Sequence, residues 1–127
     1  MECTHIIPTT RRGDVTFHAD GRIDLTAHVT KSLDLHVGDV INIIKTGGDH
    51  PEHLLYRARR ASDAIGRHAC VCHATRKRGR YLRVFNKRMA QYFLGICQCD
   101  KQVSLRTGGL APLTGHDKAI TLIVKPS

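Results

Sequence analysis

Aromatic residues are scarce in this sequence. It contains no tryptophan, and aromatic residues together make up only 5% of its 127 residues. Apolar residues still account for 41%, which predicts a core of aliphatic, often β-branched side chains. A chain of this length is expected to form one domain, here covering residues 1–127.

Long apolar runs are also absent from the sequence. None approaches the 18 residues of a membrane-spanning helix, and the first residues, MECTHIIPTTRRGD, lack the apolar segment of a secretory signal. The five cysteines are an odd number, which favours reduced thiols over a disulfide framework. These features predict a cytoplasmic protein that does not associate with membranes.

The sequence shows no arrangement of residues typical of an enzyme. Cys72 and His73 are neighbours on an expected strand, so their side chains point to opposite faces and cannot act as nucleophile and base. Thr107-Gly108-Gly109 lacks the lysine and the spacing of a phosphate-binding loop. Residues 50–53, HPEH, read as a solvated loop. We therefore expect no catalytic residues and no cofactor.

Five side chains leave a metal site open as an alternative. His68, Cys70 and Cys72 alternate along an expected strand, and Cys97 and Cys99 follow an expected helix. Thiolates and an imidazole are ligands that suit tetrahedral zinc. However, the Cys-x-Cys spacing differs from the usual Cys-x2-Cys, and cysteines on a strand are commonly small core residues. The sequence therefore predicts no metal.

Acidic residues are outnumbered by basic ones. Twenty lysines and arginines stand against eleven aspartates and glutamates, giving a formal net charge of +9. This excess favours a polyanionic partner, such as nucleic acid or an anionic surface. The alternative is a basic protein whose charge serves only its solubility.

The stretch from residue 21 to residue 48 organises the rest of the chain. Residues 22–26 alternate between apolar and polar side chains, which predicts a half-buried strand. Thr26 is expected to cap a short helix through its hydroxyl group. Residues 36–39 read as a turn in which Gly38 adopts a positive φ, and the β-branched run 40–44 reads as the next strand.

The same order of signals occurs twice. A strand at 14–19 and a strand at 54–59 complete a first strand–strand–helix–strand–strand unit over residues 14–60. A second such unit is expected over residues 68–125, with a helix capped by Asn86 and a third strand that ends at Gly108-Gly109, as the first ends at Gly47-Gly48. Residues 61–67 are expected to link the two units.

The first unit resembles the swapped-hairpin domain of the AbrB/SpoVT family, found in transition-state regulators and MazE-type antitoxins. The residues that match its pattern are Gly21, Arg22, Ile23, Leu25, Leu33, Leu35, Gly38, Asp39, Val40 and Ile43. Thr26 stands where the family usually has proline. Two tandem copies resemble the arrangement in MraZ-type proteins, which implies a mainly β fold, a pseudo-two-fold barrel of two ββαββ units with two short helices. A double-psi β-barrel is the alternative topology.

Basic residues gather around the second unit, and this clustering suggests the function. The expected contacts to nucleic acid are Arg22, Lys31, Arg76, Lys77, Arg78, Arg80, Arg83, Lys87 and Arg88. For three of these, Arg22, Lys31 and Arg80, the resemblance to the AbrB/SpoVT family implies a place on the DNA-binding face. The scarcity of aromatic rings offers little stacking surface for single strands, so duplex DNA is the expected partner of a regulatory or architectural protein, as a monomer or a homo-oligomer. The alternative is a non-enzymatic interaction module, antitoxin-like or a subunit of a phage or mobile-element assembly, that binds an acidic protein.

Overall fold

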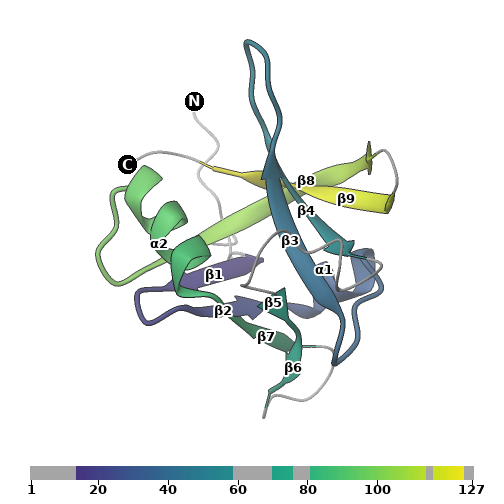
Figure 1. The fold of residues 1–127 in the computed structure, drawn as a ribbon, viewed down its shortest axis with the longest axis horizontal. Helices are drawn as coiled ribbons and strands as arrows, with labels where there is room; N and C mark the ends of the chain where they lie inside the picture. The colour runs from purple at the N-terminus through teal and green to yellow at the C-terminus, as the bar shows by residue number, and fades with distance from the viewer. Residues whose placement is uncertain (1–13, 59–69, 76–80, 114–115, 125–127) are drawn as a thin grey trace, which may run out of the picture.

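The computed structural model describes residues 14–58, 70–75, 81–113 and 116–124. The fold is mainly β. Within these residues, nine strands form one antiparallel sheet in the order β5-β3-β4-β9-β8-β1-β2-β7-β6, and the sheet curls into a half-barrel that two helices accompany (Figure 1). The expected linker at residues 61–67 lies outside the described residues.

The first half of the chain follows the expected order of elements. Strand β1 (Val15–His18), strand β2 (Arg22–Leu25), helix α1 (Ala27–Ser32), strand β3 (Val40–Lys45) and strand β4 (His53–Ala58) appear in turn. The β1–β2 loop ends at Gly21, whose φ of +100° suits a three-residue hairpin loop. Gly38 has φ +94°, as the turn prediction requires.

The second half repeats this order with a divided first strand. Its elements are β5 (Cys70–Val71), β6 (His73–Ala74), β7 (Leu82–Phe85), α2 (Lys87–Ile96), β8 (Gln102–Leu113) and β9 (His116–Ile123). The predicted cap of the second helix is confirmed, because the side-chain oxygen of Asn86 accepts a hydrogen bond from the Met89 amide at 2.9 Å.

Residues 70–74 connect the two ends of the sheet. Cys70 and Val71 pair with β3, and His73 and Ala74 pair with β7. Between them, the Cys72 amide donates to the Asp39 carbonyl at 2.8 Å. One short extended segment therefore forms backbone hydrogen bonds with both ends of the curled sheet, which leaves few unpaired backbone groups at those ends.

The core lies inside the curl of the sheet. Val15, Phe17, Ile23 and Leu25 alternate inward from β1 and β2 and are buried. Helix α2 covers this region and stacks Phe93 on Phe17, with ring centroids 4.5 Å apart. The expectation of a largely aliphatic core holds, with these two rings at its centre.

The predicted end of the third strand in the second unit is wrong. Strand β8 continues through Gly108-Gly109 to Leu113, and its register with β9 shifts between Thr107 and Leu110. Glycine accommodates such a bulge without a side chain to displace. Because β9 continues to pair with β8 beyond Gly108-Gly109, this pair of glycines bends the strand and does not end it. Gly47-Gly48, in contrast, follows the end of β3.

The predicted hydroxyl cap of the first helix is also wrong. Thr26 occupies the N-cap position, but its side chain makes no capping hydrogen bond. Its Oγ1 is buried and has no hydrogen-bond partner among the described residues. The helix start is held instead through the backbone, since the Thr26 amide donates to the Asp14 carbonyl at 3.1 Å.

Replacing Thr26 with valine is therefore expected to stabilise the protein by about 1 kcal/mol. Valine has nearly the same shape, and the change removes a buried hydroxyl that lacks a partner. Chemical denaturation of both proteins measures the difference. Thr30→Val serves as the control, because the Thr30 hydroxyl donates to the Ala27 carbonyl at 3.1 Å and its loss should destabilise. A destabilised Thr26→Val variant would contradict the prediction.

Candidate polyanion-binding face and adjoining cavity

The outer surface of β8, β1, β2 and β7 is polar because these strands alternate. Residues 23 and 25 point into the core, so Arg22 and Asp24 point outward. The strand register then aligns outward side chains in one row across five strands, in the order Ser104, Thr16, Asp24, Arg83, His73. We call this surface the outer face.

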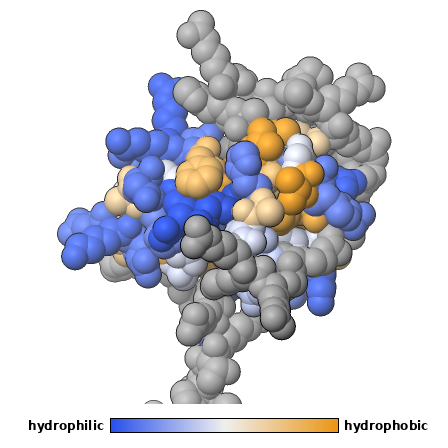
Figure 2. Space-filling model, turned by 90° about the horizontal axis from the view of Figure 1, so that it is seen from below, coloured by the Kyte–Doolittle hydropathy of each residue, from blue (hydrophilic) through white to orange (hydrophobic). Residues whose placement is uncertain are grey.

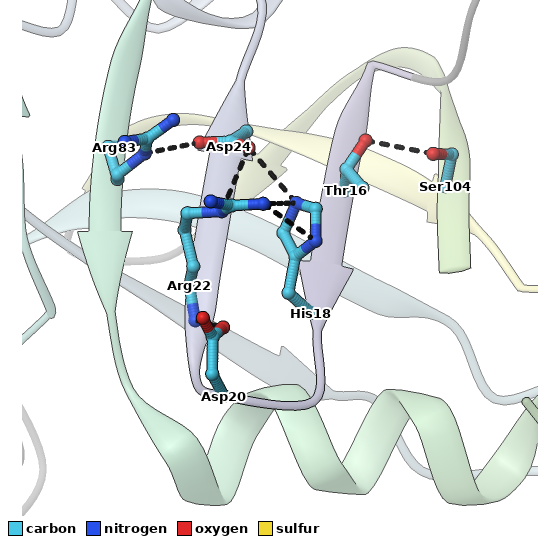
Figure 3. A network of polar contacts seen from close by, with 7 residues as sticks. All are labelled: Thr16, His18, Asp20, Arg22, Asp24, Arg83 and Ser104. Carbon is cyan, nitrogen blue, oxygen red and sulfur yellow. Dashed lines mark hydrogen bonds and ion pairs between the residues drawn. The ribbon is translucent and has the colours of Figure 1, made fainter. Parts of the chain in front are cut away.

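Asp24 is the centre of a polar network on the outer face (Figure 3). Its Oδ1 accepts a hydrogen bond from Arg83 Nε at 2.7 Å, and its Oδ2 lies 3.0 Å from His18 Nε2 and 3.6 Å from Arg22 Nε. Arg22 Nη2 lies 3.2 Å from His18 Nδ1. A single carboxylate thus holds two arginines side by side and partly neutralises them.

The β1–β2 hairpin brings the start of α2 to the edge of this network. The Asn86 amide donates to the Gly21 carbonyl at 2.9 Å. A Cβ atom on Gly21 would lie 3.0 Å from Lys87 Cα, so only glycine allows this approach. The exposed Lys87 consequently lies beside the hairpin that carries Arg22.

The nine residues predicted to contact nucleic acid are not all found in one place. The structure brings Arg22 and Arg83 together and sets Lys87 close to them. Lys31 is exposed on the last turn of α1, which follows the opposite end of β2. Arg88 lines a cavity behind α2. Arg76, Lys77, Arg78 and Arg80 lie outside the described residues.

Most of the net positive charge belongs to segments outside the described residues. The described residues include ten lysines and arginines and nine aspartates and glutamates. The remaining segments contain the other ten basic residues and only Glu2 and Asp63 as acids. Seen from below, the coloured, described residues are mainly hydrophilic, with separate hydrophobic patches among them (Figure 2). The described part of the chain is thus nearly neutral, and residues 76–80 between β6 and β7 contain four basic residues and no acid.

The cysteines are mainly core residues where they are described. Cys72 and Cys97 are buried in the main hydrophobic cluster. Burial raises the pKa of the Cys97 thiol, and the neighbouring Cys99 adds to the effect. Within the described residues, no three His, Cys, Asp or Glu side chains come together as metal ligands. His68 and the side chain of Cys70 are not described.

A cavity of about 560 Å³ lies between α2 and the β3–β4 hairpin. Ile43, Met89 and Phe93 contribute apolar walls, and Lys45 and Arg88 contribute cationic groups. On its wall, His53 Nε2 lies 3.0 Å from the Tyr92 hydroxyl oxygen. A second cavity of about 310 Å³ shares Lys45, His53 and Tyr92 with the first.

The sequence alone does not predict this cavity. The HPEH stretch was expected to be a solvated loop, but His53 is the first residue of β4 and is half-buried, with its ring centroid 5.3 Å from that of Phe93. Its partner Tyr92 is 39 residues away in sequence. The three- and four-residue spacing of apolar residues predicts that Met89 and Phe93 lie on one face of α2, but no local pattern shows which strand that face packs against.

His53 is expected to make stability fall at mildly acidic pH. Burial, with a smaller effect of the Lys45 charge, lowers the pKa of His53 below 6.5. The unfolded chain therefore binds more protons than the folded one below pH 6.5, and stability falls as the pH drops through the folded-state pKa. Thermal unfolding of the wild type and of His53→Gln between pH 7.5 and 5 measures this loss of stability, and the exposed His50→Gln serves as the control. If stability fell no more steeply with decreasing pH in the wild type than in His53→Gln, the prediction would be contradicted.

Comparisons with known proteins leave the family open. No protein-family model matches the chain, and no curated protein and no solved structure matches it. Among the described residues, neither helix is long and apolar enough to cross a membrane. The function must therefore be argued from the geometry and charges of this chain.

Proposed function

We propose that this protein binds duplex DNA, in a regulatory or architectural role, through basic residues at the β6–β7 connection and on the adjoining outer face. The observation that carries this proposal is the distribution of charge. The described residues are nearly neutral, whereas the remaining segments are strongly basic, and the densest of these is residues 76–80. Guanidinium and ammonium groups concentrated in one short segment suit contacts with phosphate oxygens.

The strands on either side of residues 76–80 are hydrogen-bonded into the sheet. Before it, His73 pairs with Arg83, and Ala74 pairs with Leu82. Strand β7 in turn pairs with β2 over residues 82–85. Backbone pairing on both strands of this hairpin restricts its two ends, so less conformational entropy is lost when the basic side chains engage a partner.

The strand order supports a finer proposal for the fold, namely two tandem swapped-hairpin units of the AbrB-like kind. Exchanging the two halves converts β2 into β7, β3 into β8 and β4 into β9, and the joined segment β5–β6 into β1. Every strand pairing then maps onto an observed pairing: β1–β2 onto β6–β7, β3–β4 onto β8–β9, β1–β8 onto β5–β3, and β2–β7 and β4–β9 onto themselves. A pseudo-two-fold barrel accounts for this symmetry.

One feature of the outer face favours the alternative partner, an acidic protein surface. Phe85 is 58% exposed and pairs across strands with Arg22. Its ring centroid lies 6.0 Å from that of His73. An exposed aromatic ring among arginines is typical of the residues that dominate protein–protein interfaces.

The DNA proposal is tested by fluorescence anisotropy with a labelled duplex of mixed sequence, titrated across salt concentration. Each phosphate neutralised contributes about −0.9 to the log–log slope. Replacing Arg78 and Arg80 with glutamine should reduce the slope by up to about 1.8 and weaken binding about tenfold or more. The matched control is Lys45→Gln with Arg57→Gln, which removes the same charge from β3 and β4, outside the outer face.

Equal losses in the two double variants would indicate attraction by net charge alone. No binding at low salt would reject the DNA proposal and leave the acidic protein partner, for which Phe85→Ser becomes the informative variant.

Asp24→Asn is a variant that is expected to strengthen DNA binding. It removes the carboxylate between Arg22 and Arg83, and affinity for the duplex should rise a few-fold.

A further inference from the structure

The cavity behind α2 is separate from the outer face. Consecutive helix residues point about 100° apart, and here the consecutive Lys87 and Arg88 differ in this way. Lys87 lies against Gly21 in the β1–β2 hairpin. Arg88 instead lines the cavity with Lys45 of β3. Whatever occupies the cavity therefore meets a set of side chains that is distinct from the Asp24 network.

The lining has two chemical parts. Ile43, Met89 and Phe93 form apolar walls, and Tyr92 adds an aromatic ring whose centroid lies 5.0 Å from that of Phe93. Lys45 and Arg88 are the cations, and the described lining includes no carboxylate. Burial lowers the pKa of His53 and so favours its neutral ring, which leaves the two cations to carry the charge. This combination is complementary to an anion attached to an apolar body.

The size of the cavity sets the class of ligand. Its volume of about 560 Å³ falls within the range of small-molecule sites. Apolar walls with a few convergent polar groups are typical of such sites. The adjacent cavity of about 310 Å³ shares Lys45, His53 and Tyr92, but its lining includes the Glu52 carboxylate, so the anionic group belongs in the larger cavity.

We propose that the cavity between α2 and the β3–β4 hairpin binds a small organic anion, consisting of a flat apolar body with one carboxylate. The body packs against Met89, Phe93 and Ile43. The carboxylate is held by Arg88 and Lys45. This site does not depend on the DNA proposal, because its cations are Lys45 and Arg88, whereas the DNA test replaces Arg78 and Arg80.

The test uses naphthalene carboxylate as the probe and naphthalene carboxamide as its uncharged counterpart. Because the chain contains no tryptophan, naphthalene fluorescence can be followed against the weak tyrosine background of the full-length protein. The carboxylate is expected to bind with a submillimolar Kd and the carboxamide about fivefold or more weakly, since charge-assisted hydrogen bonds are lost. Arg88→Gln and Lys45→Gln should each weaken carboxylate binding about threefold to tenfold.

Lys87→Gln is the matched control. It removes one charge from the same turn of α2, and it should change the Kd less than twofold because Lys87 does not line the cavity. Equal affinity for carboxylate and carboxamide would overturn the proposal. So would the absence of saturable binding at millimolar probe, or a Lys87→Gln effect as large as that of Arg88→Gln. All three substituted residues are exposed, so unchanged thermal midpoints should accompany the binding data.

Discussion

Replacing Asp14 with alanine is expected to lower the free energy of unfolding by about 3–4 kcal/mol. Asp14 is 3% exposed, and its Oδ2 accepts hydrogen bonds from the Thr107 amide at 2.9 Å and the Thr107 hydroxyl at 2.7 Å. Alanine would leave both buried donors without this acceptor, at about 1–3 kcal/mol each. The thermal midpoint should fall by roughly 10–15 °C, as differential scanning calorimetry would show.

Two further variants separate this interaction from a general effect of losing an aspartate. Asp49→Ala removes an exposed carboxylate from the β3–β4 loop and should change stability by less than about 0.5 kcal/mol. Thr107→Val removes the hydroxyl donor but keeps the amide, so combining it with Asp14→Ala should cost less than the sum of the single changes. Additive effects, or a small Asp14→Ala effect, would show that the pair does not hold β1 to β8.

Replacing Gly21 with alanine is expected to lower the free energy of unfolding by about 3 kcal/mol. At φ +100° an alanine is strained by about 1–3 kcal/mol. Its Cβ would also lie 3.0 Å from Lys87 Cα, which is backbone and cannot move aside as a side-chain tip does. The first turn of α2 would have to shift away from the β1–β2 hairpin. Chemical denaturation measures the cost.

Gly38 supplies the control for this prediction. Its φ of +94° is nearly the same, but nothing lies within 4 Å of a Cβ placed there. Gly38→Ala should therefore show the backbone strain alone, about 1–2 kcal/mol. The difference between the two variants measures the contact between the hairpin and α2. Equal destabilisation would mean that α2 adjusts to the extra methyl group without cost.

The elements of the fold could be predicted because their signals are local. Ile23 and Leu25 alternate with Arg22 and Asp24, and this alternation identifies β2 wherever the strand lies in the sheet. Asn86 caps α2 through a hydrogen bond to a residue three positions later. Gly38 adopts the positive φ that its turn needs. In each case the interaction spans only a few residues, so the sequence nearby contains the information.

Two local predictions failed where tertiary contacts compete with local preference. Gly108-Gly109 resembles the end of a strand, yet β9 keeps pairing with β8 beyond it and turns the glycines into a bulge. Thr26 resembles a capping residue, yet the backbone bond from its amide to Asp14 is what holds the start of α1. A glycine pair or a threonine permits either outcome, and packing selects one.

Local sequence patterns specify the order of strands and helices, the aliphatic character of the core and the excess of positive charge. Which side chains meet depends on the tertiary structure. Arg83 reaches Asp24 across 59 positions, Tyr92 reaches His53 across 39, and Thr107 reaches Asp14 across 93. Such contacts depend on the pairing of strands from different halves of the chain, and alternation along one strand does not specify its neighbour. The network on the outer face and the cavity behind α2 both arise from that pairing.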